Sequence, residues 1–316
     1  MLKHEKQIKE YEEALEALKK QSEENKLLKR SEIQKLEKKL VKLKNTVYSK
    51  LTAWQRVEIS RHPERPNAKD FIVNICESFK EVFGDRLYQD DHAIITGFGI
   101  INGQKVAIVA QEKGKDTETR LYRNFGMPYP EGYRKALRIM KLAEKFAIPV
   151  ITIIDTPGAY AGLAAEERGQ GWAIAENLLE MSKLKTPIVS IVIGEGCSGG
   201  ALGIGVADKV AMLEHAYYTV ISPEGCASIL WRDAQKKDKA AETLKMHAEN
   251  LQQYGIIDDI IEEPQGGAHH DQEQMYERVK EYISSTLPGL LQKSPEVLCA
   301  HRYEKFRAMG VYEESN

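Results

Sequence analysis

From residue 194 to residue 201 the sequence is Gly194-Glu195-Gly196-Cys197-Ser198-Gly199-Gly200-Ala201, directly after the apolar run Ile188–Ile193. An apolar run that ends in glycines and small residues is typical of a buried strand that turns into a helix. Each glycine lets the backbone approach a ligand without a Cβ, and the N–H groups at a helix start point the same way. The segment is therefore a candidate site for an anionic oxygen, unless it is only a tight turn with packing glycines.

The glycine spacing also matches the dinucleotide pattern G-x-G-x-x-G, and Glu214 ends the next apolar run, where a ribose-binding acid would lie. The helix between them would run only over residues 200–207, and it would contain Gly203 and Gly205, which are poor helix formers. A Rossmann crossover helix is longer, so this interpretation is disfavoured.

A serine hydrolase is the next alternative, because residues 196–200 match G-x-S-x-G with Ser198 at the centre. Acids and histidines follow in the chain order of an α/β-hydrolase triad: Asp258, Asp259, His269 and His270. The remaining alternative is an oxyanion hole without a nucleophile, in which backbone amides alone stabilise a developing negative oxygen. These residues by themselves do not decide between the two.

A second turn, Asp155-Thr156-Pro157-Gly158, follows the apolar run Val150–Ile154. It matches the D-x-x-G of GTPases, but the chain contains no G-x-x-x-x-G-K-[ST], so nucleotide hydrolysis is not expected. In a parallel sheet such a turn lies at the carboxyl end of its strand, where ligands usually bind. It is therefore either a turn that lines a ligand site or a simple strand-to-loop connection.

Basic residues are concentrated between residues 113 and 134, on both sides of Asn124-Phe125-Gly126-Met127-Pro128. They are Lys113, Lys115, Arg120, Arg123 and Arg134. Such a stretch is either a solvated charged loop or a contact for a phosphate or carboxylate group.

The composition excludes several classes of protein. The 316 residues carry a net charge of -2, so no strong field selects nucleic acid or anionic lipid, and 42% hydrophobic residues allow a sizeable core. No stretch approaches the roughly 18–20 apolar residues of a membrane span, and the first residues lack the apolar run of a signal peptide. The four cysteines form no C-x-x-C pair, so we expect no metal site and a reducing, cytoplasmic location.

Two parts of the chain differ in pattern. Residues 1–50 contain no Gly or Pro, and their apolar residues recur at steps of three and four, which predicts a helical hairpin with a turn at 21–25. Its stripes need a surface to cover, so we expect a role in assembly. Residues 51–316 alternate strands and helices and form the second unit.

In this second unit, Asn102-Gly103 between two apolar runs predicts a hairpin with a type I′ turn. The apolar runs bounded by glycines predict buried parallel strands covered by helices, an α/β fold. The expected strands are 94–101, 106–109, 150–154, 188–193, 210–213, 218–221 and 256–261. The expected helices are 131–146, 169–184, 223–231, 240–251 and 272–285.

Several long strings resemble the acetyl-CoA carboxylase carboxyltransferase alpha subunits of the bacterial and plastid multisubunit type, and the resemblance covers nearly the whole chain. The strings are Arg123–Pro128 continuing through Pro130–Arg138, Asp155–Tyr160 with Glu166–Gln170, Gly194–Ala201, and Ile221–Trp231. The family pattern has Gly where this chain has Cys197 and Pro where it has Ala161, and neither position is a carried-over oxyanion donor.

The resemblance implies a crotonase-like fold of the ClpP/crotonase superfamily, a spiral of ββα units. It implies an α2β2 carboxyltransferase that moves the carboxyl group of carboxybiotin to acetyl-CoA and gives malonyl-CoA. It implies three partners: the beta subunit, a biotin carboxyl carrier protein that bears the biotin, and biotin carboxylase in the full complex. No nucleic acid and no metal in this chain are implied. A self-contained serine esterase using Ser198 is the alternative.

Carried over by position, Gly199 and Gly200 would supply backbone amides to the ureido oxygen of biotin. The resemblance further implies biotin-side loops made of Asp155, Pro157, Gly158, Ala159, Gly196 and Ser198. Anion contacts from Arg123 and Arg134 are a further expectation. No side-chain base is required, because the freed biotin nitrogen can take the proton from acetyl-CoA.

Overall fold

The computed structural model describes residues 2, 5–24 and 30–310. Its strands are β1 (Ser78–Glu81), β2 (Ile94–Ile101), β3 (Gln104–Gln111), β4 (Val150–Thr156), β5 (Ile188–Cys197), β6 (Lys209–Leu213), β7 (Tyr217–Thr219) and β8 (Asp259–Ile261). Its α-helices are α1 (Lys6–Glu24), α2 (Arg30–Tyr48), α3 (Ala53–Ser60), α4 (Ala68–Ile75), α5 (Thr117–Tyr122), α6 (Pro130–Lys145), α7 (Leu163–Glu167), α8 (Gln170–Lys183), α9 (Ser198–Leu202), α10 (Pro223–Trp231), α11 (Lys237–Leu244), α12 (Ala248–Gln253), α13 (Gln272–Leu291) and α14 (Pro295–Arg307).

The strands form one mixed sheet in the order β1-β2-β3-β4-β5-β6-β8, and β7 adds to the far end of β5. β1, β2 and β3 are antiparallel, whereas each pairing from β3 to β8 is parallel. Every residue of β4 and β5 is buried, as expected for central strands covered on both faces. The carboxyl ends of these two strands therefore lie side by side.

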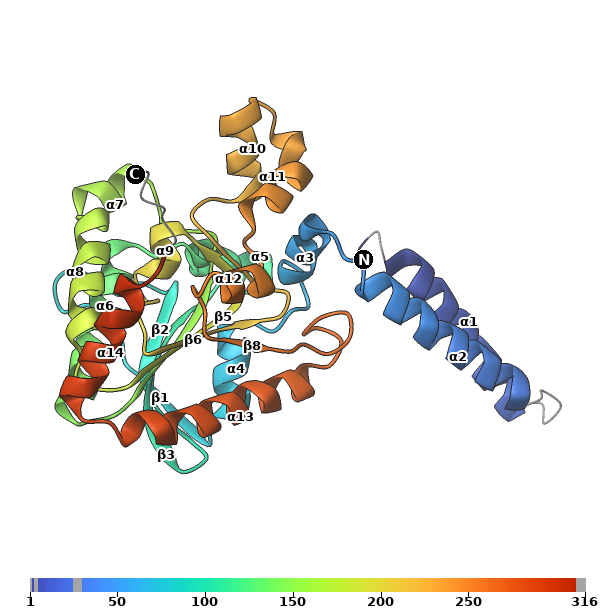
Figure 1. Ribbon diagram of the computed structural model, residues 1–316, viewed down its shortest axis with the longest axis horizontal. Helices are drawn as coiled ribbons and strands as arrows, with labels where there is room; N and C mark the ends of the chain where they lie inside the picture. Colours follow the sequence, from blue (N-terminus) through green and yellow to red (C-terminus); the bar gives the residue numbers. More distant parts are fainter. Residues whose placement is uncertain (1, 3–4, 25–29, 311–316) are drawn as a thin grey trace, which may run out of the picture.

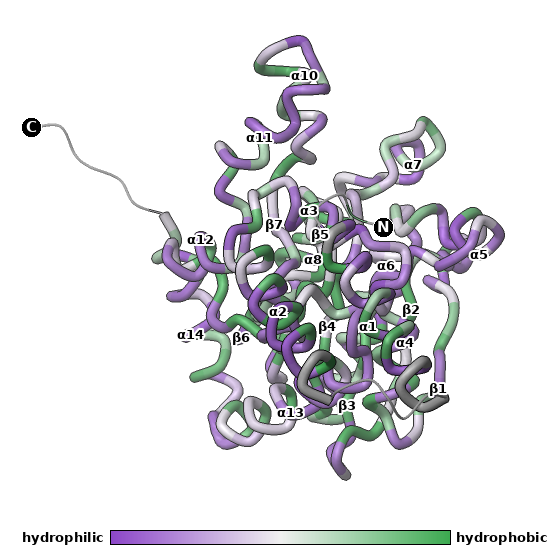
Figure 2. Tube along the Cα trace, turned by 90° about the vertical axis from the view of Figure 1, so that its right-hand side faces the viewer, coloured by the Kyte–Doolittle hydropathy of each residue, from purple (hydrophilic) through white to green (hydrophobic). Residues whose placement is uncertain are grey.

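Helices cover both faces of the sheet. α6, α8 and α14 lie together on one side, while α4 and the long α13 lie on the other (Figure 1). Phe71 of α4 packs edge-on against Tyr276 of α13, with ring centroids 5.3 Å apart. Hydrophobic residues follow the central strands, and α10 and α11 protrude from the body (Figure 2).

The N-terminal hairpin projects from the body, with α1 and α2 side by side (Figure 1). Ile8 and Leu15 are buried, and ion pairs join the two helices, such as Lys19 to Glu37 at 2.7 Å and Lys44 to Glu12 at 2.6 Å. No helix among the described residues is both long and apolar enough to cross a membrane.

Most of the expected elements are present. Asn102 and Gly103 both have positive φ, 47° and 75°, which confirms the expected hairpin turn. The expected end of the strand at residue 193 is wrong, because β5 continues through Cys197 by pairing with β4 and β7. Pairing across the sheet thus overrides the glycines that seemed to end this strand.

Several boundaries also differ. The single helix expected over 240–251 is two helices, because Lys245 takes a left-handed conformation and ends α11. The helix expected over 200–207 is only the five-residue α9. α13 extends beyond residue 285 to Leu291, and α1 continues through Glu24, so the turn expected at 21–25 does not begin there. Residues 25–29 lie outside the described part of the chain.

Candidate functional site

The glycine-rich segment and the Asp155 turn meet at the carboxyl ends of β4 and β5. Thr156 pairs with Gly196 across the two strands, and α9 begins at Ser198. Ligands usually bind outside the carboxyl ends of parallel strands, so the topology itself marks this edge.

A buried charge cluster forms the base of the site. The ammonium of Lys113 lies 2.6 Å from Oδ1 of Asp155 and 2.7 Å from Oε2 of Glu195. Asp155 also accepts a hydrogen bond from the N–H of Glu195 at 2.8 Å. Lys113 thus leaves the basic loop and bridges the ends of β4 and β5.

Arg61 of the segment after α3 completes this cluster. Its Nε lies 2.8 Å from Oε1 of Glu195, its Nη1 lies 2.6 Å from Oε1 of Glu224, and its Nη2 donates to the hydroxyl of Tyr217 at 2.8 Å. Tyr217 in turn donates to Glu195. The Glu195 carboxylate is therefore held from three directions, by Lys113, Arg61 and Tyr217.

The pKa values of the two carboxyls shift in opposite directions. Burial opposes the ionisation of Glu195, but Lys113 and Arg61 outweigh it and hold its pKa at about 2. Burial raises the pKa of Asp155, and although Lys113 acts in the other direction, it does not cancel this effect. For Lys113, burial alone would lower the pKa, but Asp155 and Glu195 raise it, so the ammonium stays charged.

A polar cavity of about 320 Å³ opens beside this cluster. Its lining includes Arg61, Arg65, Lys113, Lys115, Arg120 and Pro157. Arg120, one of the basic residues noted in the sequence, thus lies at the same edge as Asp155. The excess of cationic groups favours an anionic or carbonyl-bearing ligand.

Hydrogen bonds hold the backbone on both sides of Gly200. The Gly200 carbonyl oxygen accepts from Nε2 of Gln111 at 2.7 Å and from the hydroxyl of Tyr133 at 3.1 Å. The preceding peptide group, which carries the Gly200 N–H, is held through the Gly199 carbonyl, which accepts from the N–H of Gly203 at 2.9 Å. A Cβ added to Gly200 would lie 2.4 Å from the backbone nitrogen of Ala159, so only glycine allows this approach of the two loops. Gly158 and Ala159 therefore pack directly on the start of α9.

The backbone amides at this point are the donors that the site presents. Within the described chain, the N–H groups of Gly199 and Gly200 make no hydrogen bond to another residue. Gly199 is half-buried and Gly200 is buried. Ser198 and Gly199 also line a separate, mainly apolar hollow of about 310 Å³ with Leu202, Tyr218 and Val220.

Among the described residues, no catalytic triad is assembled around Ser198. The side chain is exposed and its φ is positive, at 51°, as in a strained nucleophile turn. However, His269 and His270 lie against Glu5, and Asp258 pairs with Lys305. Cys197 is not an activated thiol either, because burial raises its pKa to about 12.

The other site residues expected from the sequence are Pro157, Gly196, Arg123 and Arg134. Pro157 is exposed and Gly196 is buried in the β5–β7 pair. Arg123 donates to the carbonyl of His92 at 2.7 Å and lies over the ring of Tyr122. Arg134 is engaged inside the protein by two carboxylates, those of Asp85 and Glu131. The candidate site is therefore built without Arg134.

Sequence reasoning missed Arg61 and Tyr217 and did not separate Glu195 from its glycine neighbours. An acid between two glycines at a strand end was the one available signal for Glu195. No local pattern marks Arg61, which lies 134 residues from its partner.

Two comparisons with known proteins agree on the family. A family model described as acetyl co-enzyme A carboxylase carboxyltransferase-like matches residues 1–310. A relative from Chlamydia pneumoniae is 58% identical over 316 residues, which is 100% of this chain and 98% of the relative. Another from Protochlamydia amoebophila is 58% identical over 314 residues, 99% of each chain. Both are named acetyl-coenzyme A carboxylase carboxyl transferase subunit alpha.

Solved structures show the same fold at low sequence identity. The transcarboxylase 12S structure with methylmalonyl-coenzyme A has a TM-score of 0.54 at 21% identity and covers 70% of this chain and 42% of that one. The beta subunit of geranyl-CoA carboxylase from P. aeruginosa has a TM-score of 0.55 at 13% identity and covers 84% and 47%. The expected crotonase-like α/β fold is confirmed.

Proposed function

Because the chain belongs to the family of acetyl-CoA carboxylase carboxyltransferase alpha subunits, we propose that it supplies the biotin side of the enzyme that makes malonyl-CoA from acetyl-CoA. This reaction is the first committed step of fatty acid synthesis. The esterase alternative is not supported, because the histidines and Asp258 contact other partners in the described chain and the relatives reported above are carboxyl transferase subunits.

The observation that carries the proposal is the pair of amides at Gly199 and Gly200. The carbonyl of Gly199, in the same peptide group as the Gly200 N–H, accepts from the N–H of Gly203, and the Gly200 carbonyl accepts from Gln111 and Tyr133. Both amides lack partners within the described chain. Carboxybiotin, when presented by its carrier, supplies the carboxyl group and then a basic nitrogen. In this proposal the two amides would donate to its ureido oxygen, where negative charge would develop during transfer.

Other residues shape the loops around these amides. Gly158 and Ala159 support the start of α9, while Pro157 and Ser198 form the exposed rim. Asp155 and Gly196 support these loops from the buried side. Asp155 does so through its ion pair with Lys113, and Gly196 through the pairing of β5 with β7. Arg123 is a candidate contact for an anionic group near the rim.

The chain acts with partners. The reaction develops negative charge on two oxygens, one on biotin and one on the thioester, whereas a single pair of such amides is proposed here. A beta subunit in an α2β2 complex therefore supplies the second set and most of the acetyl-CoA site. A biotin carboxyl carrier protein delivers biotin, biotin carboxylase recharges it, and the cytoplasm is the location that fits these partners.

Reconstitution tests this proposal. The purified chain alone, given carboxybiotin and acetyl-CoA, should form no malonyl-CoA, and addition of the beta subunit should restore turnover. A rate for the isolated chain close to that of the complex would contradict the proposal. The matched control is carboxybiotin decay without acetyl-CoA, which separates transfer from simple decarboxylation.

The hairpin formed by α1 and α2 is proposed to serve assembly. It projects from the body (Figure 1), and the apolar side chain of Val41 on α2 is exposed. Removal of residues 1–50 should weaken association with the beta subunit, as measured by sedimentation. Thermal unfolding of the truncated chain separates this effect from a folding defect. Normal association and turnover after truncation would assign the hairpin another purpose.

A further inference from the structure

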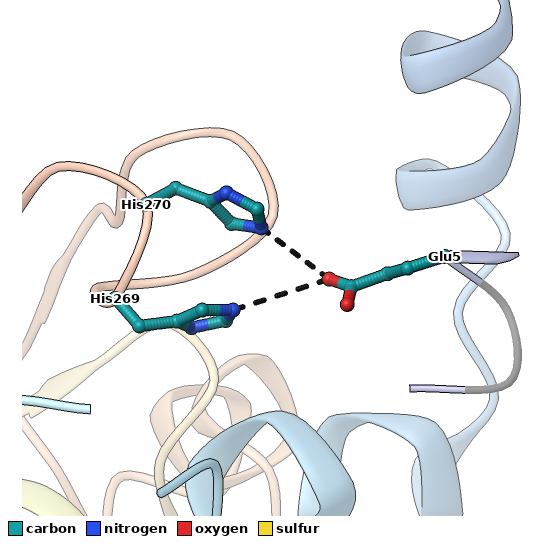
Figure 3. A group of neighbouring side chains, drawn as sticks. All are labelled: Glu5, His269 and His270. Carbon is teal, nitrogen blue, oxygen red and sulfur yellow. Dashed lines mark hydrogen bonds and ion pairs between the residues drawn. The ribbon is translucent and has the colours of Figure 1, made fainter. Parts of the chain in front are cut away.

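Three side chains from distant parts of the chain meet at the base of the hairpin. Glu5 lies directly before α1, and His269 and His270 lie in the loop between β8 and α13 (Figure 3). Nε2 of His270 is 3.3 Å from Oε1 of Glu5, and Nε2 of His269 is 4.0 Å from the same oxygen. One ligand atom from each residue lies within 4.8 Å of the other two.

The ring of His269 is buried and has no hydrogen-bond partner among the described residues. Its side chain is only 4% exposed, and both Nδ1 and Nε2 are unsatisfied. The 4.0 Å contact with Glu5 is too long for a hydrogen bond. Burying a polar group without a hydrogen-bond partner costs free energy, so such a group is expected to bind a ligand, an ion or a water molecule.

The surroundings hold these groups in place. His62 stacks on His269 with ring centroids 3.9 Å apart and an interplanar angle of 19°. Gly267 has a φ of 122°, and a Cβ there would lie 3.0 Å from the His269 ring. The hydroxyl of Tyr48, at the end of α2, lies 3.2 Å from Oε1 of Glu5 and donates to it. Outer partners of this kind orient metal ligands.

We infer that Glu5, His269 and His270 bind one divalent transition-metal ion of the zinc class, which fastens the start of α1 to the loop before α13. Imidazole nitrogen and carboxylate oxygen bind Zn²⁺ at about 2.0–2.2 Å, so ligand atoms in a tetrahedral site lie roughly 3.4 Å apart. The 3.3 Å pair already matches this spacing, and the 4.0 Å pair requires a small inward rotation. Water fills the fourth position.

The role of this ion is structural. The cluster joins the hairpin to the body, whereas the amides of Gly199 and Gly200 lie at the sheet edge. No sign of this site is visible in the sequence, because none of its ligands is a cysteine and Glu5 and His270 are 265 residues apart in the chain. Mg²⁺ is excluded as the occupant, since it prefers oxygen ligands in octahedral geometry.

Titration of the full-length, chelator-treated chain with Co²⁺ tests the inference. One equivalent should bind with the visible absorption of tetrahedral Co²⁺, Zn²⁺ should displace it, and Mg²⁺ should not. His269→Ala and Glu5→Gln should each weaken binding by at least about tenfold. His301→Ala is the matched control, because His301 is exposed on α14, and it should bind as the unaltered chain does.

Stability gives a second readout that does not depend on activity. Zn²⁺ should raise the Tm of the unaltered chain and slow hydrogen exchange in α1, and it should do neither in Glu5→Gln. Glu5→Gln retains an oxygen that can accept from Tyr48, so it guards against a folding defect in His269→Ala. Absence of Co²⁺ binding, or Co²⁺ binding by the Glu5→Gln and His269→Ala variants as tight as that of the unaltered chain, would overturn the inference in favour of a metal-free polar contact.

Discussion

The glycine-rich segment is divided at Ser198 into a strand half, Gly194–Cys197, and a helix half, Ser198–Ala201. The strand half is buried and paired on both sides, and its one acid is held by Lys113, Arg61 and Tyr217. The helix half is partly open, and it presents amides without partners in the described chain.

This difference shows how a loop of small residues can hold its backbone amides in a defined position. The helix half has few side chains to hold it, so its position depends on the strand half and on the Gly158–Ala159 turn. The charge cluster therefore stabilises the position of the segment, and the amides bind the ligand. Changes to the two halves should produce different defects, one chemical and one thermodynamic.

The largest effect is expected from Gly200→Val in the helix half. A side chain there would collide with the backbone of Ala159 and displace the amides. Loss of one oxyanion donor costs roughly 10²–10³ in kcat, about 3–4 kcal/mol, while KM for acetyl-CoA should change little. Steady-state kinetics of the reconstituted complex would measure both constants.

Gly199→Ala is the matched control for this variant. A Cβ at Gly199 would meet only the side chain of Ile174, at 3.6 Å, which is an ordinary contact, and the amide would be retained. Turnover should stay within a few-fold of the unaltered enzyme. Normal kcat in a well-assembled Gly200→Val complex would mean that the oxyanion hole lies on another loop.

Lys113→Met, in the strand half, should chiefly reduce stability. It would leave Asp155 and Glu195 as neighbouring buried carboxylates, and breaking a buried ion pair costs about 3 kcal/mol or more. Chemical denaturation would measure this loss. Lys115→Met is the control, because its exposed pair with Asp70 is worth at most about 1 kcal/mol. Equal losses of unfolding free energy in Lys113→Met and Lys115→Met would mean that the charge cluster has no special role in stability.

The pH dependence of stability should report on Glu195. Its folded pKa of about 2 lies below the ordinary value of 4.5, so its contribution is present above pH 4.5 and lost as the pH falls toward 2. In Glu195→Gln, the Tm should therefore fall less steeply over this range than in the unaltered chain. Asp155 shifts in the opposite direction but is present in both proteins. Parallel Tm curves would contradict the shift.

The smallest effect is expected from Ser198→Ala. The hydroxyl has no catalytic partner in the described chain, and the alanine keeps every backbone amide. Turnover should remain within about a factor of two, and fluorophosphonates should not label the unaltered chain. Stoichiometric labelling at Ser198 would restore the hydrolase interpretation.

The sequence by itself determined the local elements and the two loops that form the site. Hydrophobic runs, the Asn102-Gly103 turn and the glycines of 194–201 act over a few residues, so their patterns are visible in the chain. Long shared strings then identified the family and its crotonase-like fold. The amides of Gly199 and Gly200 follow from position in such a string.

Only the tertiary structure decided what surrounds those amides. The parallel order of β3, β4 and β5 brings Lys113 to Glu195 across 82 residues. The packing of α3 against β5 brings Arg61 to Glu195 across 134 residues. Contacts between distant parts of the chain also extend β5 through its glycines, by pairing with β7, and place Glu5 against His270. Such contacts depend on which strands and helices become neighbours, and no local spacing of residues encodes that choice.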